Sequence, residues 1–186
     1  MSIPSSYRQA GLSLIELVMF IVIVGVAVAG VLSVMNITTQ HSADPMVRKQ
    51  ALAIAEALLE EIELQPFTYC FPTDPLALTA SSASGCTGGV AGSEDTLPAT
   101  ARVSSPRNAN NVSDYTNFSM SPIVDITGSP ITGLGAYTAS VSIAQVGTSF
   151  SLPATDVLQI DVRVVSGSTD ITLTGYRFRY APNAVP

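Results

Sequence analysis

One uninterrupted apolar run near the N-terminus constrains this chain more than any other feature. From Leu12 to Met35, 24 residues contain a single charged side chain, Glu16, and no proline. As a helix the run would be about 36 Å long at about 1.5 Å per residue, and the hydrocarbon core of a bilayer is about 30 Å thick. Because backbone groups in lipid must be paired within their own segment, residues 12–35 are predicted to form a membrane-spanning helix.

Glu16 is the anomaly in this predicted helix. A charged side chain inside a membrane costs about 2.5–3.5 kcal/mol on insertion scales, so an intramembrane carboxylate marks a functional position. The nearest cation upstream, Arg8, lies two helical turns away and beyond the reach of contacts between neighbouring turns. We therefore expect the partner of Glu16 to lie on another molecule.

Small residues recur along the same predicted helix. Gly25, Ala29 and Ser33 are spaced four residues apart, a pattern that lets another helix approach closely. At about 100° per residue, Gly25 lies half a turn round from Glu16. Both faces of the helix therefore suit helix neighbours, which a lone anchor does not need.

The sequence Gly11-Leu12-Ser13-Leu14-Ile15-Glu16 follows a short polar leader with one arginine and opens the apolar run. In this it resembles the N-terminal signal of type IV pilins and pseudopilins. The resemblance is strong over residues 11–35 and looser over 44–70, where it is most similar to minor pilins of the mannose-sensitive haemagglutinin type. Leu12 stands where phenylalanine is more usual, and Ser33 where the family commonly carries a proline.

The resemblance implies a processing step and a set of partners. Prepilin peptidase would remove residues 1–11 by cutting after Gly11, and would methylate the new amine of Leu12. The helix would lie in the bacterial inner membrane with the C-terminal domain in the periplasm, before assembly with other pilin or pseudopilin subunits into a filament. There Glu16 would pair with the N-terminal amine of a neighbouring subunit.

Other interpretations of the N-terminus remain open. Arg8, the apolar run and Ala27-Val28-Ala29 also match an ordinary secretory signal, although Glu16 is then unexplained. The run could equally be a plain signal anchor. At the level of function, the alternatives to a minor pilin are a type II secretion pseudopilin and a single-span, membrane-anchored periplasmic binding protein.

A second helical segment is predicted over residues 36–65. After a mostly polar interlude, Asp44 and Pro45 form an N-cap and first-turn pair, where a new helix begins or the first resumes. Apolar residues then recur at helical spacing and predict an amphipathic stalk: Val47, Ala51, Ile54, Ala55, Leu58 and Ile62. Arg48 and Lys49 near its start and glutamates near its end oppose the helix dipole, so they either pair with filament neighbours or are simply solvated.

Residues 66–135 are predicted to be loop-rich and variable. Cys70 and Cys86 are the only cysteines in the chain, and no histidine lies near them to complete a metal site. A disulfide is the favoured interpretation, which requires an oxidising compartment such as the periplasm; two reduced thiols are the alternative. Residues 80–96 resemble a low-complexity linker, and 101–103 and 118–124 are candidate strands.

Residues 136–186 predict an antiparallel sheet. Apolar and polar side chains alternate over 136–146 and 157–165, and 171–180 returns after a turn at 166–170. The alternation in the last strand changes phase, which predicts a bulge at Gly175. Arg163, Arg177 and Arg179 are then expected to form a small solvated basic patch. The chain is thus predicted to be α+β, with the long helix packed on this sheet, as the pilin resemblance also implies.

Composition and motifs exclude several classes of function. The net charge is −6, or −7 without Arg8 in the leader, and no basic cluster suits a nucleic acid. His41 is the only histidine, so no nucleophile and base constellation, metal set or phosphate loop is recognisable. Glu56, Glu60 and Glu63 share a helix face without a histidine, a weak basis for a metal site. We expect no enzymatic activity, cofactor, metal or small-molecule substrate.

Overall fold

The computed structural model describes the backbone of residues 13–104 and 106–183, with side chains except those of 36–44. The predicted cleavage site between Gly11 and Leu12 lies outside the described residues, as do the side chains of His41 and Asp44. The chain forms two compact units, Met1–Pro45 and Met46–Pro186.

One helix, α1, runs from Leu14 to Glu63 and contributes to both units. Of the two expectations for residues 36–45, the structure has the first helix continuing, with Pro45 inside it. Within the first unit, every described side chain from Ser13 to Met35 is exposed, and the segment Leu14–Met35 is long and apolar enough to cross a membrane. The prediction that this segment forms a helix of membrane-spanning length is therefore confirmed.

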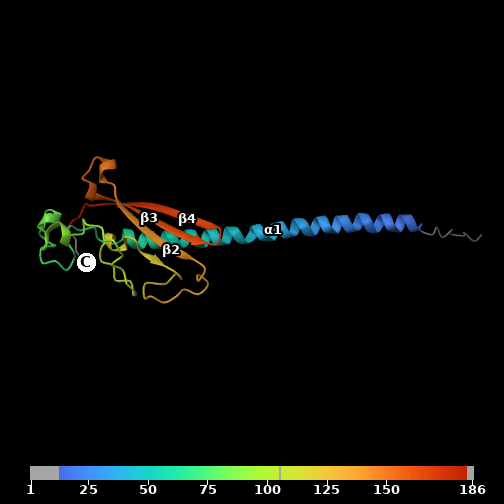
Figure 1. Ribbon diagram of the computed structural model, residues 1–186, viewed down its shortest axis with the longest axis horizontal. Coiled ribbons are helices and arrows are strands. Elements are labelled where there is room, and N and C mark those ends of the chain that lie inside the picture. Colours follow the sequence, from blue (N-terminus) through green and yellow to red (C-terminus); the bar gives the residue numbers. More distant parts are fainter. Residues whose placement is uncertain (1–12, 105, 184–186) are drawn as a thin grey trace, which may run out of the picture. The chain divides into compact units, whose positions relative to one another are not determined.

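The second unit contains an antiparallel sheet of four strands, the last three of which are labelled in Figure 1. The strands are β1 (Ser119–Met120), β2 (Thr138–Gln145), β3 (Val157–Ser166) and β4 (Thr169–Phe178), in the order β1-β2-β3-β4. The three C-terminal strands agree with the predicted segments. Gly167, at φ +57°, takes the left-handed conformation in the tight turn between β3 and β4.

The core of this unit lies between the sheet and the helical stretch that begins at Met46. One helix stripe and one sheet face are buried together: Ala51, Ala55, Leu58, Ile62, Ala139, Val141, Ile143, Leu158, Ile160, Val162 and Val164. The register pairs the inward residues of β2 directly with those of β3, as in Val141 opposite Val162. The α+β arrangement of a long N-terminal helix and a C-terminal antiparallel sheet is confirmed.

The predicted bulge at Gly175 is wrong. The β3–β4 pairing is regular throughout, and Gly175 lies opposite Ile160 on the helix side of the sheet. A Cβ atom at Gly175 would lie 2.9 Å from Leu59 Cδ1 and closer still to the Glu63 carboxylate. Glycine is therefore needed here because α1 approaches the strand closely, and the backbone keeps its normal pleat.

The phase change in β4 has a different cause from a bulge. Tyr176 and Phe178 point to the face of the sheet away from the helix, where Phe150 stacks edge-on against both rings. Phe150 ends a short 3-10 helix, Gly147–Phe150, in the connection between β2 and β3. In Figure 1 this connection, in orange, stands on the side of the sheet opposite the α1 ribbon. The aromatic side chains of this half of β4 therefore form an outer cluster with Phe150.

Residues 66–104 and 106–118 are folded rather than linker-like. Three 3-10 helices, Ala83–Gly85, Gly89–Gly92 and Val112–Tyr115, punctuate this stretch. The candidate strand at 101–103 does not form, and only Ser119–Met120 of the second candidate is a strand. Ser93 and Glu94, in the segment that resembles a linker, are fully or almost fully buried.

Candidate functional sites

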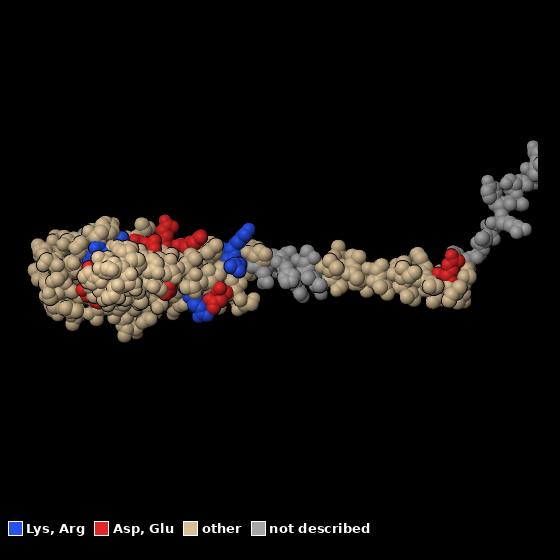
Figure 2. Space-filling view, turned by 90° about the horizontal axis from the view of Figure 1, so that it is seen from above, with Lys and Arg blue, Asp and Glu red and all other residues tan. Residues whose placement is uncertain are grey.

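Glu16 lies one turn into α1, on the exposed surface of the apolar segment. Ser13 precedes the helix and caps it, because its carbonyl accepts from the Glu16 N–H at 3.1 Å and its hydroxyl lies 3.3 Å from the same N–H. Figure 2 shows this end of the described chain as uncharged surface with one acidic group, which is Glu16. Among the described residues, no lysine or arginine forms an ion pair with it.

The small-residue face of the same segment is open. Gly25, Ala29 and Ser33 are exposed, and a Cβ atom built on Gly25 would meet nothing within 4 Å. The described chain therefore leaves room for another helix on this face. Among the described residues, no second α-helix is present to occupy this face.

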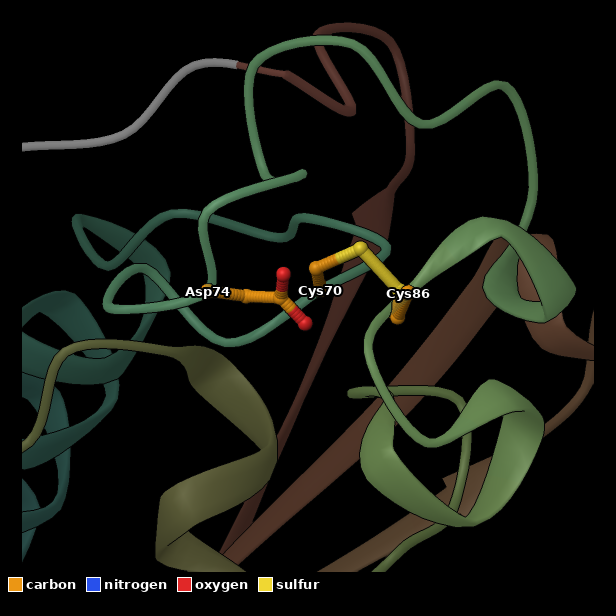
Figure 3. Close-up of side chains that lie close together, drawn as sticks. All are labelled: Cys70, Asp74 and Cys86. Atoms are coloured by element: carbon orange, nitrogen blue, oxygen red, sulfur yellow. A yellow bond between two sulfur atoms is a disulfide. The ribbon is translucent and has the colours of Figure 1, made fainter.

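Cys70 and Cys86 form a disulfide, which confirms the predicted pairing. Figure 3 shows that the Asp74 carboxylate lies beside the two sulfurs, the geometry of a potential metal group. However, sulfurs joined to each other are not available as thiolate ligands. The carboxylate instead accepts hydrogen bonds from the Leu76 and Thr87 backbone N–H groups, each at 2.8 Å, and from the Thr87 hydroxyl at 2.9 Å.

These hydrogen bonds, led by that of the Leu76 N–H, lower the pKa of Asp74. Asp74 and the disulfide thus act on the same loop: the covalent bond closes it, and the carboxylate ties its two ends together. This cluster is structural, and it fixes the loop between Cys70 and Thr87.

A buried ionic network, missed at the sequence level, lies next to the disulfide region. Glu94 is fully buried, and Arg102 reaches both its carboxylate and that of Asp114, the latter at 2.6 Å. The Ser113 hydroxyl donates to Glu94 and accepts from Arg102 Nη2 at 2.8 Å. Burial raises the pKa of Glu94, against the opposing effects of Ser113 and Arg102.

The expected basic patch on the sheet does not exist. Only Arg163 is solvated, in a pair with Asp170 that lowers the pKa of that carboxyl. Arg177 lies on the opposite face from Arg163, because the register pairs it with the inward residue Leu158. The side chain of Arg179 is 1% exposed, paired with Asp95 and stacked on two aromatic rings, those of Phe67 and Tyr69.

The glutamates of the helical stretch after Met46 also differ in their surroundings. Glu61 is held within the unit, because Arg107 Nε lies 2.7 Å from its carboxylate and the Tyr115 hydroxyl donates to it at 2.7 Å. Burial, followed by the nearby carboxylate, raises the pKa of Tyr115 well above its usual value. Glu56 and Glu60 remain exposed.

An apolar pocket of about 530 Å³ opens beside these residues, between the helical stretch from Gln50 to Glu61 and the segment 120–134. Its walls include Ala53, Ala57, Met120, Ile123, Ile126 and Ile131. Arg107 and Glu61 close one side of it as an ion pair. We call it the helix-side pocket. Its size and lining are typical of sites that receive an apolar group.

Comparison of the chain with protein-family models, with curated proteins and with solved structures gives no match.

Proposed function

We propose that this chain is a structural subunit of a type IV pilus, similar to the minor pilins that serve in assembly, initiation or adhesion. Prepilin peptidase removes the leader after Gly11 and methylates Leu12. The apolar half of α1 holds the subunit in the bacterial inner membrane and then in the filament, while the unit Met46–Pro186 faces the periplasm. The Cys70–Cys86 disulfide suits that oxidising compartment.

The observation that carries this proposal is Glu16, a carboxylate on an exposed apolar helix without an ion-pair partner in the described chain. In an apolar filament core an uncompensated charge is costly, so the carboxylate selects the helix register that brings a cation to it. The methylated amine of a neighbouring Leu12 is that cation. The open face at Gly25, Ala29 and Ser33 supports close packing with a second helix.

The role of the carboxylate is tested by Glu16→Ala in the full-length chain, with Glu56→Ala as the matched control. Glu56 is an exposed glutamate of the same helix, outside the apolar segment. We expect Glu16→Ala to be cleaved normally but to be strongly depleted from sheared filaments relative to the membrane fraction, and Glu56→Ala to behave like the parent. Normal incorporation of Glu16→Ala would remove the role assigned to it.

A second candidate is a membrane-anchored periplasmic binding protein, and the helix-side pocket is the observation that favours it. Such a protein keeps its helix in the membrane permanently and needs neither cleavage after Gly11 nor a partner for Glu16. A chain that stays in the membrane fraction with an unprocessed N-terminus would select this candidate.

A further inference from the structure

The helix-side pocket has apolar walls from two parts of the unit Met46–Pro186. On α1, Ala53 and Ala57 are exposed alanines whose small side chains leave the space open. Across the pocket, Ile131 and the 63% exposed Ile126 form part of the other wall. A volume of about 530 Å³ with such a lining suits the apolar body of a small organic molecule.

The wall that carries Ile126 is held in place by hydrogen bonds to its backbone. Arg107 donates to it twice, from its N–H to the Ile126 carbonyl at 2.9 Å and from Nη1 to the Val124 carbonyl at 3.1 Å. The Ile131 N–H donates to the Ile123 carbonyl at 3.0 Å and closes the turn. The pocket is therefore preformed, so little conformational entropy is lost when a ligand fills it.

Three charged side chains line the pocket, and their charges do not cancel. Arg107 Nε lies 2.7 Å from the Glu61 carboxylate, so these two compensate each other. Asp125 has no ion pair among the described residues. Its Oδ1 accepts from the Thr127 N–H and hydroxyl at 2.8 and 2.7 Å and from the Ser129 N–H at 2.9 Å. Since Oδ2 accepts none of these bonds, the wall keeps one uncompensated negative charge with an available acceptor oxygen.

The Asp125 carboxylate is charged at neutral pH. Its hydrogen bonds, led by that from the Thr127 hydroxyl, lower the pKa of Asp125. The remaining polar side chain of the wall, Gln50, is uncharged and already accepts from the Tyr137 hydroxyl at 2.6 Å. An anionic ligand would therefore meet a like charge, whereas a cation meets an opposite charge at Asp125.

We propose that the helix-side pocket binds a small organic cation, with its apolar body between Ala57 and Ile126 and a protonated amine on Asp125 Oδ2. The amine supplies hydrogen-bond donors together with the charge, and such charge-assisted hydrogen bonds are stronger than neutral ones. A lysine side chain of another protein brings the same charge but only a thin aliphatic stem, which leaves most of the pocket unfilled. The whole site lies within the unit Met46–Pro186, so this inference goes beyond the proposed function and does not depend on the fate of the apolar helix.

The charge preference is tested with three probes that share one apolar body: phenylbutylamine, phenylbutanol and phenylbutanoate. Each is titrated into full-length protein in an uncharged detergent, and the isoleucine methyl groups are followed by NMR. We expect saturable shifts at Ile126 and Ile131, with the carboxylate binding most weakly. The amine should bind about fivefold more tightly than the alcohol, a modest factor because water reaches the pocket and screens the charge.

Two other isoleucines serve as internal controls. Ile160 is buried in the core, and Ile21 is exposed on the apolar segment, where it reports uptake of a probe into the detergent. Shifts confined to Ile21 would overturn the proposal, and so would equal affinity for the amine and the alcohol.

Matched variants locate the site. Ala57→Phe fills the pocket from an exposed position and is expected to abolish binding of both the amine and the alcohol. Asp125→Asn is expected to lower the affinity for the amine about fivefold and to leave that for the alcohol unchanged. Asp170→Asn removes an exposed carboxylate outside the pocket and should behave like the parent. Unaltered binding of the amine to Asp125→Asn or to Ala57→Phe would contradict the proposal.

A fourth probe separates a small molecule from a protein partner. Lysine amide with an acetylated α-amine carries the same protonated amine on its aliphatic stem alone, and we expect it to bind about tenfold more weakly than phenylbutylamine. If it binds equally well, the apolar body is not recognised and the proposal fails. The comparison of probes uses the parent protein, so it decides the question even if Asp125→Asn does not fold.

Discussion

Removing Arg102 should destabilise the unit Met46–Pro186 in a way that depends on pH. The guanidinium is the cation for two buried carboxylates, Glu94 at 0% and Asp114 at 5% exposure. Breaking a buried pair by removing one partner costs about 3–5 kcal/mol, because it leaves a buried charge uncompensated. Arg102 itself is 31% exposed, so water reaches the site and we take the lower end, about 3 kcal/mol.

The assay is thermal unfolding of full-length Arg102→Met in detergent, followed by circular dichroism with the disulfide intact. A loss of about 3 kcal/mol corresponds to a fall in Tm of about 6–12 °C for a unit of this size. Arg163→Met is the matched control, since it removes the same group from an exposed pair with Asp170, and its Tm is expected to stay unchanged.

The pH dependence identifies the cause. Burial already raises the pKa of Glu94 above its ordinary value of 4.5, and loss of the cation raises it further. The folded variant then binds a proton more tightly than the unfolded chain, so its stability rises as pH falls from 7 toward 5. The difference in Tm between Arg102→Met and the parent should therefore become smaller over this range. Adding Glu94→Gln to Arg102→Met should make this difference smaller at pH 7. A gap that is independent of pH, or no larger than that of Arg163→Met, would refute this reasoning.

Two further predictions concern the stability of the same unit. Replacing Cys70 and Cys86 together by serine should lower the free energy of unfolding by about 3 kcal/mol, because the bond closes a loop with a sequence separation of 16 residues. Denaturant unfolding checks this, with the parent under reducing conditions as comparison. A denaturation midpoint of the serine variant equal to that of the disulfide-bonded parent would contradict it. Gly175→Val should cost about 1–3 kcal/mol through overpacking against Leu59, measured in the same way, whereas a bulged strand would accept the substitution without loss.

The strands and the helix could be predicted because each has one buried face. Val162 and Ile160 alternate with polar residues on β3, and Ala51, Ala55 and Leu58 recur at helical spacing on α1. The spacing of the apolar residues therefore indicates directly which face of each element is buried. The disulfide followed from counting, since only two cysteines were available.

The strand β4 shows where that reasoning fails. Its first half carries Ile171 and Leu173 on the inner face, and its second half carries Tyr176 and Phe178 on the outer face, because the connection around Phe150 partly covers that side. Alternation reports which face is buried only when the other is solvated. A regular strand partly covered on two sides therefore looked like a strand with a slipped phase, and Arg177 and Arg179 were assigned to the wrong environment.

The network around Glu94 could not be found from local sequence. Its members are separated by eight and twelve residues in a stretch without periodicity, and the tertiary fold of residues 66–118 brings them together. One signal was present: charged residues are sparse in this Ser, Gly and Ala-rich part of the chain, with five between residues 80 and 118, and only 12% of the whole chain is charged. In such surroundings an isolated charge is worth considering as a buried and paired one.

The mass of the mature N-terminus tests the central claim most directly. Full-length protein is isolated from membranes and filaments of a host that contains a prepilin peptidase, and its N-terminal peptide is analysed by mass spectrometry. The proposed function predicts that the chain begins at Leu12 and carries one methyl group on its amine. A chain that retains Met1, or one that begins at Gly30 after a conventional signal cut, would contradict it.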